Sequence, residues 1–266
     1  MTSALSGSRR SPWQVQRAVL YALVLRELKT RFGGRWFGAL WVLAEPLVHV
    51  LLLLMLLGAA RHRLLPGIDF VLFLVTGLLP FFMFRNLALR SMDAIDANRG
   101  LFGYRQVRPI DALLARAILE VALYSVVYLL VLALLGWGGY DVLPARPLEV
   151  AASSAALLLL GLGIGLTLAV ATDALPQARG LVRIAFFPLY LLSGVIFPIQ
   201  SLPGEVLSWL LWNPVLHALE VSRGFFFVGY RPVAEASGAY VAACAIVCTA
   251  FGLSLYRVRR QRLLTT

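Results

Sequence analysis

Residues 150–172 read VAASSAALLLLGLGIGLTLAVAT, a stretch with no charged side chain. An α-helix needs about 20 residues to cross a hydrocarbon core about 30 Å thick, so this stretch predicts a transmembrane helix. Five further apolar blocks approach or reach that length, at residues 38–60, 70–89, 112–136, 184–199 and 236–256. The pattern predicts an all-α polytopic membrane protein, with residues 1–266 forming a single domain of six transmembrane helices.

The composition also favours a lipid environment. Hydrophobic residues make up 60% of the chain and charged residues 14%, whereas about a quarter of the residues of a soluble domain are charged. The net charge of +11 does not indicate nucleic-acid binding, because the basic residues lie beside the ends of the apolar blocks, where membrane topology places them. No signal-peptide pattern precedes the first block, so we expect the N-terminal segment to stay attached.

The distribution of Lys and Arg predicts the orientation. Cytoplasmic loops carry an excess of positive charge, and all but five of these 24 residues fall at one set of helix ends. The five at the opposite ends are Arg61, Arg63, Arg146, Arg223 and Arg231. Both termini are therefore predicted to lie in the cytoplasm.

Three segments are too polar or too interrupted to span the membrane. Residues 13–34 mix apolar and charged side chains, which predicts an amphipathic helix lying in the cytoplasmic interface until Gly33 and Gly34 end it. Residues 90–111 are polar and form a long cytoplasmic connection. Residues 200–232 are apolar but broken by Pro and Gly, which predicts short helices that re-enter the outer leaflet between the last two spans.

The small residues inside the spans predict helix packing. Gly161, Gly163 and Gly165 are spaced like a phosphate-binding loop, but they lie deep in an uncharged block, which favours close approach of another helix. Cys244 and Cys248 are one helical turn apart in the last block, so we expect them to pack as small hydrophobic residues without a disulfide.

The residue patterns of enzymes and metal sites are missing. Lys29 is the only lysine, so the nucleotide-binding loop G-x-x-x-x-G-K-[ST] is absent. The three histidines, His49, His62 and His217, have no Cys or carboxylate partners at ligand spacing. No G-x-S-x-G elbow and no acidic cluster inside the spans occurs. We expect no catalytic residue, no metal and no cofactor bound by this chain.

Ionisable residues inside the spans are candidates for a substrate path, because charged groups in a bilayer are costly and mark functional sites. The candidates are Glu45, His49, Arg85, Glu120, Tyr124, Tyr128 and Arg183. Glu45 and His49 are four residues apart and share a helical face. A structural interpretation is equally open, in which Glu45 is solvated near the interface or paired with Arg35.

A second stripe consists of Glu120, Tyr124 and Tyr128. Sugar rings can slide along aromatic faces, but packing against neighbouring helices explains the same pattern. Arg85 and Arg183 lie at the predicted cytoplasmic mouth, where cationic side chains suit an anionic cargo and also follow from the topology rule.

Residues 26–33, RELKTRFG, resemble the N-terminal signature of ABC-2 type permeases, together with Gly38, Trp41, Glu45 and Pro46. Two later runs resemble the KpsM type of these permeases, the inner-membrane subunits of Gram-negative capsular polysaccharide exporters. These runs are residues 93–102 (DAIDANRGLF) with 104–105 and 108–111, and residues 212–217 (WNPVLH) with Glu220, Ser222 and Arg223. The resemblance covers essentially the full length of the chain.

The resemblance implies a permease subunit of the bacterial inner membrane. It would form a homodimer, bind two ATP-binding cassette subunits that hold ATP and Mg, and pass a lipid-linked acidic polysaccharide to periplasmic and outer-membrane export proteins. By the same analogy the interface helix would dock on the ATPase through Arg26, Glu27, Lys29 and Arg31. The connection after the second span would act as the coupling helix through Asp93, Asp96, Asn98, Arg99, Phe102, Tyr104, Arg105 and Arg108.

Other functions stay open at this point. The chain could be a permease of the same architecture that exports O-antigen, teichoic acid or a hydrophobic small molecule in place of a capsular polysaccharide. A secondary transporter driven by an ion gradient would use Glu45 and His49 as a proton relay. A membrane-embedded transferase would turn over substrate alone, and the missing acidic cluster argues against it.

Overall fold

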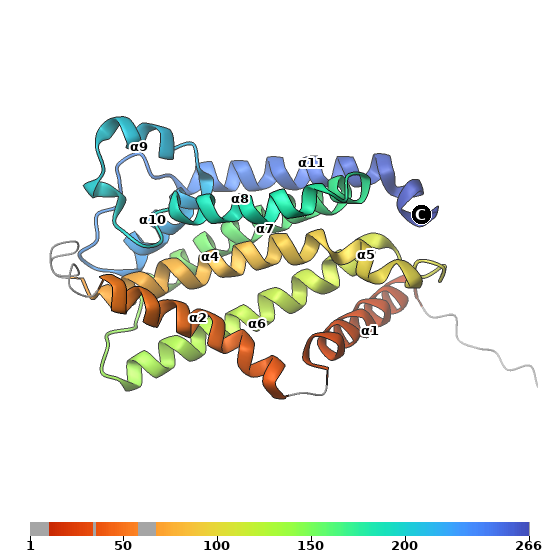
Figure 1. Ribbon diagram of the computed structural model, residues 1–266, viewed down its shortest axis with the longest axis horizontal. Helices are drawn as coiled ribbons and strands as arrows, with labels where there is room; N and C mark the ends of the chain where they lie inside the picture. Colours follow the sequence, from red (N-terminus) through yellow and green to blue (C-terminus); the bar gives the residue numbers. More distant parts are fainter. Residues whose placement is uncertain (1–10, 34–35, 58–67, 266) are drawn as a thin grey trace, which may run out of the picture.

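The computed structural model describes residues 11–33, 36–57 and 68–265, and every regular element within them is helical (Figure 1). The elements are α1 (Pro12–Phe32), α2 (Trp36–Leu57), α4 (Phe70–Met92), α5 (Ala94–Asn98), η1 (Arg99–Leu101), α6 (Pro109–Trp137), α7 (Pro147–Ala174), α8 (Ala178–Leu191), η2 (Ile199–Ser201), α9 (Gly204–Leu210), α10 (Pro214–Phe226) and α11 (Gly238–Thr265). One end of the bundle carries α9 and α10, and we call it the α9 end. The other carries α5 and the last residues of α11, and we call it the α5 end.

Among the described residues, four helices are long and apolar enough to cross a membrane: α4, α6, α7 and the Gly238–Leu263 part of α11. The predicted spans 70–89, 112–136 and 150–172 lie inside the first three, and the predicted span 236–256 is helical from Gly238 onward. The chain is therefore a multi-pass membrane protein.

Two further helices match predicted spans less closely. α2 agrees with the prediction 38–60 as far as Leu57, and residues 58–60 lie outside the described part of the chain. Its apolar stretch is the shorter segment Ala44–Leu56. The bounds predicted for the fifth span, 184–199, are wrong, because α8 begins at Ala178 and ends at Leu191.

The early end of α8 has both a local and a long-range cause. Pro188 has no N–H to donate to the preceding turn, and the chain turns soon afterwards at Gly194, whose φ of +67° is left-handed. Asn213 holds this turn from outside, since its side-chain amide donates to the Ser193 hydroxyl at 2.9 Å. The apolar residues that follow Leu191 therefore form a packed turn rather than a longer helix.

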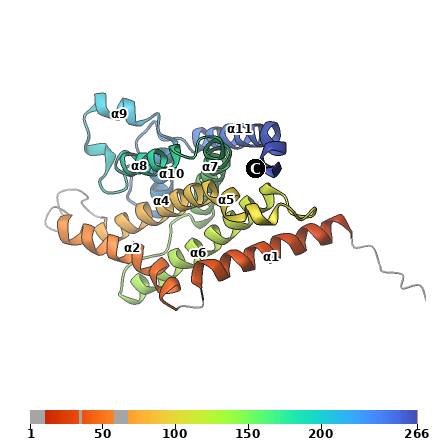
Figure 2. The ribbon, with the colours of Figure 1, turned by 45° about the vertical axis from the view of Figure 1, so that its right-hand side comes forward.

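The N-terminal helix forms where the sequence predicts it. Ser11 and Gln14 make a reciprocal capping box at its start, and Gly33 ends it with a left-handed φ of 51°. α1 packs along the first part of α6, on the outside of the bundle (Figure 2).

The glycines of α7 let two neighbours approach closely, as predicted. A Cβ atom at Gly163 would lie 2.6 Å from the Thr249 nitrogen of α11. A Cβ atom at Gly165 would lie 2.7 Å from the Ser91 Cβ of α4, on the other side of the helix. α7 therefore packs tightly between α4 and α11 because it lacks side chains at these positions.

At the α9 end, α10 is fixed to the bundle by a fully buried arginine. The Arg223 guanidinium donates to the carbonyls of Gly194 (2.6 Å), Val195 (3.0 Å) and Phe73 (3.1 Å). It also lies 3.6 Å from the Phe73 ring centroid, a cation–π contact. Glu220 supplies the opposite charge at 3.7 Å. The sequence predicts Arg223 at this side of the membrane, but not the three segments that it holds together.

Gly77 makes room for this arginine. A Cβ atom at position 77 would lie 2.1 Å from Arg223 Nη2, so any larger residue at position 77 of α4 displaces the guanidinium.

We predict that Arg223→Leu destabilises the protein by about 3–5 kcal/mol, because it leaves the Glu220 carboxylate buried without its cation and three carbonyls without a donor. Thermal unfolding of the purified protein measures the loss. Arg231→Leu is the control, since Arg231 is exposed at the same end and its removal should leave the unfolding temperature within error. Equal unfolding temperatures for the two variants would contradict the assignment.

Candidate functional site

The connection between α4 and α6 is folded and anchored. α5 and η1 follow α4 with only Asp93 between, so the connection continues the end of α4 as a compact unit. Ile95 and Phe102 are buried against residues of α6, α7 and α11. The buried side chains fix one face of the unit, and the charged side chains contact the neighbouring helices.

Asn98 joins this unit to α1. Its side-chain oxygen accepts from Arg26 Nη1 at 2.7 Å, and its amide donates to Glu27 at 2.9 Å and to the Ala94 carbonyl at 2.9 Å. Only 1% of Asn98 is exposed. Asn98 was predicted to contact the ATP-binding subunit, and in this structure its side chain contacts α1 of its own chain.

A cluster of charges joins the same unit to α7 and α8. Arg99 donates to Asp173 at 2.5 Å and to Asp96 at 2.9 Å, and Asp96 also pairs with Arg179. Burial raises the pKa of the Asp96 carboxyl, but hydrogen bonds from Arg99 and Arg179 outweigh it and hold this pKa below its ordinary value of 3.8. Asp96 is therefore ionised at neutral pH.

Two residues of this cluster were not among the predicted site residues, and a third residue nearby was predicted for the substrate path. Asp173 and Arg179 were not proposed, although a carboxylate in the last turn of an apolar helix, next to the short 175–177 connection, was a usable signal. Arg183 was expected in a substrate path, and its guanidinium donates to Asp93 at 2.8 Å.

The exposed part of the connection is its tip. Tyr104 is 66% exposed, and Gly103, Arg105, Gln106 and Arg108 are exposed beside it. The Arg108 backbone N–H donates to Asp111 at the start of α6. The tip is thus the surface of this unit that is open to another molecule.

Further contacts tie α1 to α6. Gln16 donates to Asp111 at 2.6 Å, Arg116 donates to Glu27 at 3.0 Å, and Arg31 pairs with the buried Glu120. The partners follow the same order along both helices, so α1 and α6 run side by side in the same direction. Of the four predicted interface residues, Arg26, Glu27 and Arg31 contact the bundle and Lys29 is exposed.

The candidate path residues divide between two faces of the bundle. Arg85 donates to Glu45 at 2.6 Å and lies over the Phe82 ring at 4.4 Å. His49 is 2.9 Å from the Tyr190 hydroxyl of α8. Glu45 thus pairs with Arg85, while Arg35 lies outside the described residues. Glu45 and His49 share a helical face; Glu45 pairs with α4, and His49 contacts Tyr190 of α8 and packs edge-on against Phe82 of α4.

The second stripe does not line one surface. Glu120 contacts α1, and Asn86 donates to the Tyr124 hydroxyl. Tyr128 lines a groove between α4, α6 and α7. The structural interpretation, packing against neighbouring helices, therefore accounts for Glu120 and Tyr124.

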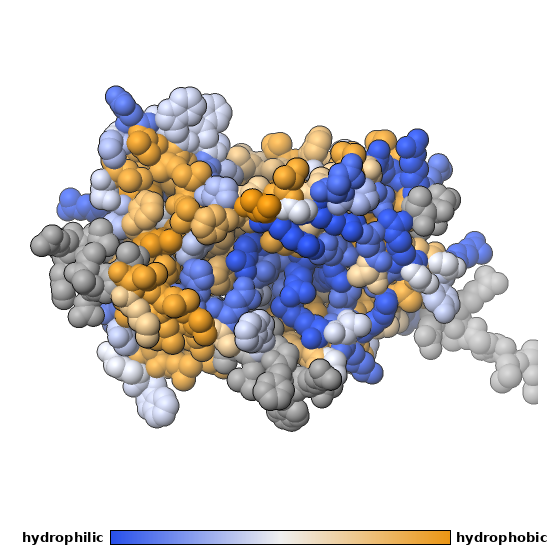
Figure 3. Space-filling view, viewed as in Figure 1, coloured by the Kyte–Doolittle hydropathy of each residue, from blue (hydrophilic) through white to orange (hydrophobic). Residues whose placement is uncertain are grey.

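Hydrophilic side chains gather over the middle of one face and toward the α5 end, whereas the part over α2 and the start of α4 is mainly hydrophobic (Figure 3). The charged side chains that pair α4 with α2, and α8 with the end of α4, keep part of their surface exposed: 25% for Arg85, 39% for Glu45 and 55% for Arg183. α4 lies at the back of the region, with α2 and α8 to either side. We call it the polar strip, defined by Glu45, Arg85, Arg90, Asp93 and Arg183.

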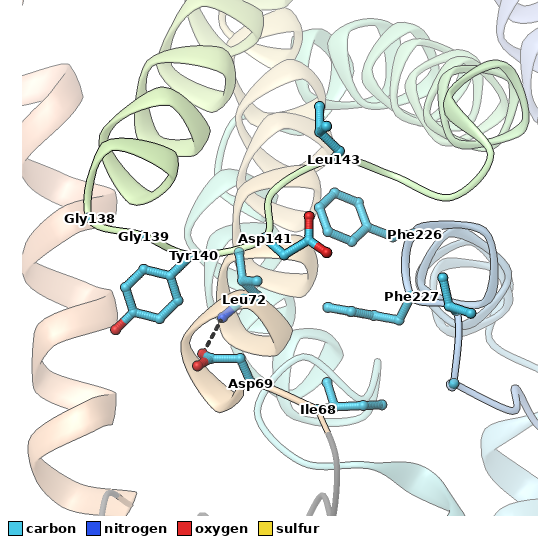
Figure 4. A pocket seen from close by; sticks show the side chains of 12 residues that line it. Ile68, Asp69, Leu72, Gly138, Gly139, Tyr140, Asp141, Leu143, Phe226 and Phe227 are labelled. Atoms are coloured by element: carbon cyan, nitrogen blue, oxygen red, sulfur yellow. Dashed lines mark hydrogen bonds between the residues drawn. The ribbon is translucent and has the colours of Figure 1, made fainter.

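A separate pocket of about 550 Å³ lies at the α9 end (Figure 4). Asp69 and Asp141 line it, but Asp69 caps α4 by accepting from the backbone N–H groups of Val71 (2.8 Å) and Leu72 (3.3 Å). In the described ranges no three His, Cys, Asp or Glu residues are grouped as metal ligands. None of the predicted site residues lines this pocket.

The chain is a multi-pass helical bundle with a charged, anchored connection between two spans and a polar strip on one face. This is the architecture of a membrane transport protein. Residues 18–227 match the family described as "ABC-2 type transporter". The chain belongs to the ABC-2 type transporter family.

The relatives extend over nearly the whole chain. The chain is 40% identical to the "Polysialic acid transport protein KpsM" of Escherichia coli over 97% of its own length and 99% of that protein. It is 29% identical to the "Capsule polysaccharide export inner-membrane protein CtrC" of Neisseria meningitidis over 91% of both chains. It is 26% identical to the "O-antigen export system permease protein RfbA" of Myxococcus xanthus, over 92% of this chain and 94% of that one.

We predict that Arg99→Gln and Asp173→Asn each loosen the connection, because each removes one side of a short charge-assisted hydrogen bond. Hydrogen exchange of the backbone amides in residues 94–101 should rise in both single variants. The double variant should exchange no faster than the faster single variant, since the two residues act through one contact. Fully additive effects would mean that the two side chains act independently.

Proposed function

We propose that this chain is the permease subunit of an ABC transporter that exports a lipid-linked capsular polysaccharide across the inner membrane. The single observation that carries this proposal is the end-to-end similarity to a polysialic acid transport protein, over 97% of this chain and 99% of that one. Two relatives with capsule-export names support the same cargo class. O-antigen is the second candidate cargo, supported by the more distant permease relative.

The topology proposed is six spans with both termini in the cytoplasm. α2 and α8 complete the count, and α9 with α10 forms the re-entrant segment of the outer leaflet. The charges support this orientation, because Arg99, Arg105 and Arg108 lie at the α5 end together with the arginines that end α11.

A second copy of the chain is proposed to cover the polar strip. Part-exposed charges such as Arg85 and Glu45 are costly against lipid, so a surface that carries them inside a membrane needs a protein or water partner. Two strips facing each other would enclose a polar passage, and the excess of guanidinium groups in it suits an acidic polysaccharide.

The ATP-binding subunit is proposed to hold ATP and Mg and to grip the exposed tip of the α4–α6 connection. Movement of the tip would pass to α1 through Asn98 and to α7 and α8 through Arg99 and Asp96. Such coupling requires that the ATPase binds the two permease states with different affinities. Beyond the membrane, periplasmic and outer-membrane export proteins would receive the polymer.

A proton relay through Glu45 and His49 has little support. Glu45 is hydrogen-bonded to Arg85 and His49 to Tyr190, so the hydrogen bond of each side chain goes to a residue other than its partner in the relay. An ion-driven secondary transporter therefore stays the weaker proposal.

We predict that Tyr104→Ala with Arg105→Ala lowers export and stimulated ATPase activity by roughly tenfold or more, as expected when an aromatic side chain that the ATPase would bury on binding is lost together with its neighbour. The unfolding temperature should not change, because both side chains are exposed. Arg257→Ala, which removes an exposed arginine from α11, should leave export intact. Wild-type ATPase stimulation in the double variant would show that the tip is not part of the interface with the ATPase.

The function itself is tested by deletion and purification in the native bacterium. Loss of the protein should trap capsular polymer inside the cell, and mild-detergent purification should retain an ATP-binding subunit. A catalytically dead ATPase should give the same trapped polymer. Export that continues without ATP hydrolysis would overturn the proposal. Trapped O-antigen in place of capsular polymer would favour the second candidate cargo.

A further inference from the structure

A small pocket of about 160 Å³ lies where α1, the end of α4 and the first part of α6 meet. Its charged lining residues are Glu27, Arg31, Arg90, Arg116 and Glu120. α1 lies along this part of α6 on the outside of the bundle (Figure 2). Arg90 also belongs to the polar strip, so the pocket adjoins that strip. Charged groups from three helices therefore converge on one cavity.

The pocket carries one positive charge in excess. Arg31 pairs with Glu120, and Arg116 donates to Glu27 at 3.0 Å. Arg90 is left over: its Nε lies 3.9 Å from Glu120, and its guanidinium makes no hydrogen bond to any described residue. The Arg90 side chain is 53% exposed. Three guanidinium groups against two carboxylates therefore suit a ligand with a single negative charge.

Two buried atoms of the lining have unused hydrogen-bonding capacity. Arg31 Nε and Glu120 Oε2 are buried, and neither has a partner among the described residues. Buried polar atoms are nearly always hydrogen-bonded, because leaving one unpaired is costly. A ligand that offers an acceptor to Arg31 and a donor to Glu120 would satisfy both atoms. Phosphate oxygens are acceptors that guanidinium groups bind well, and a hydroxyl on the same headgroup is a donor.

The pocket lies at the depth of lipid headgroups. The start of α4 and the end of α6 are at one level, because Asp69 and Gly138 line the same pocket at the α9 end. A span that begins at this level reaches the opposite membrane surface after about 20 residues, near positions 89 and 118. Arg90, Arg116 and Glu120 lie within about two residues of those positions.

We propose that this pocket binds the phosphodiester group of a glycerolipid in the leaflet at the α5 end. The phosphate oxygens accept from Arg90 and from Arg31 Nε, and a headgroup hydroxyl donates to Glu120 Oε2. The lipid thereby connects α1 to the end of α4. The phosphodiester belongs either to a phospholipid of the bilayer or to the lipid carrier of the exported polymer. The second source rests on the proposed function, whereas the first holds for any cargo.

The test uses the full-length protein purified in mild detergent. Phosphatidylglycerol and diacylglycerol with identical acyl chains differ only in the phosphoglycerol headgroup, and native mass spectrometry counts how much of each is retained. Phosphatidylglycerol should be retained roughly tenfold better or more, as expected for charge-assisted hydrogen bonds, and should raise the unfolding temperature. Equal retention of the two lipids would overturn the proposal.

A matched pair of variants separates the pocket from the rest of the basic surface. Arg90→Gln removes the surplus charge and should lower the retention of phosphatidylglycerol roughly tenfold. Arg17→Gln removes an exposed arginine of α1 that does not line the pocket, and it should retain the lipid like the wild type. An equal fall in both variants would mean that only the total positive charge matters, and the pocket would lose its role.

Purification from cells with and without polymer synthesis identifies the source of the phosphodiester. A phospholipid retained in both preparations, and lost in Arg90→Gln, assigns the pocket to a bilayer lipid. A sugar-bearing lipid retained only from polymer-producing cells, and lost in the same variant, assigns it to the carrier. If neither preparation holds a phosphate-bearing lipid that Arg90→Gln loses, the proposal is wrong. A different exported cargo would leave the phosphatidylglycerol result unchanged, so the two proposals fail separately.

Discussion

The amide side chain of Asn98, enclosed by two side chains of α1, holds the α5 end of the molecule together. A buried amide is costly unless its oxygen and nitrogen both find partners. Arg26 supplies the donor, and Glu27 and the Ala94 carbonyl supply the acceptors. Glu27 also accepts from Arg116 of α6. α5, α1 and α6 are thereby joined by a continuous chain of polar contacts, which positions the exposed tip of the connection.

Charges elsewhere in the bundle follow the same rule. Arg31 with Glu120 and Arg85 with Glu45 each join two helices, and Arg223 has a carboxylate and three carbonyls. Isolated charges cost much free energy in a low-dielectric interior, so each of these arginines fixes the position of its partner helix. The arrangement of the helices is in this sense determined by a few polar contacts within an apolar bundle.

The long apolar blocks could be predicted from the sequence, because a run of uncharged residues leaves few alternatives to a helix in lipid. The predicted bounds of the fifth span were wrong, since the turn at Gly194 depends on Asn213 and Arg223, which are distant in sequence. The family was predicted from residues 26–33 together with the 93–102 and 212–217 runs, and it is confirmed. The partner of each charge could not be predicted, because a pairing such as Arg99 with Asp173 depends on how α4 and α7 are rotated.

α4 has consequences for how any passage along the bundle opens. At one end it leads into α5 after a single residue, and near the other end its Phe73 carbonyl is bonded to Arg223 of α10. Its 23 residues make a rod about 34 Å long at 1.5 Å per residue. A helix fastened at both ends transmits a tilt imposed at α5 to α10, apart from any bend at Pro80, which removes one backbone hydrogen bond from its middle. The two mouths of such a conduit are mechanically linked and change width in concert.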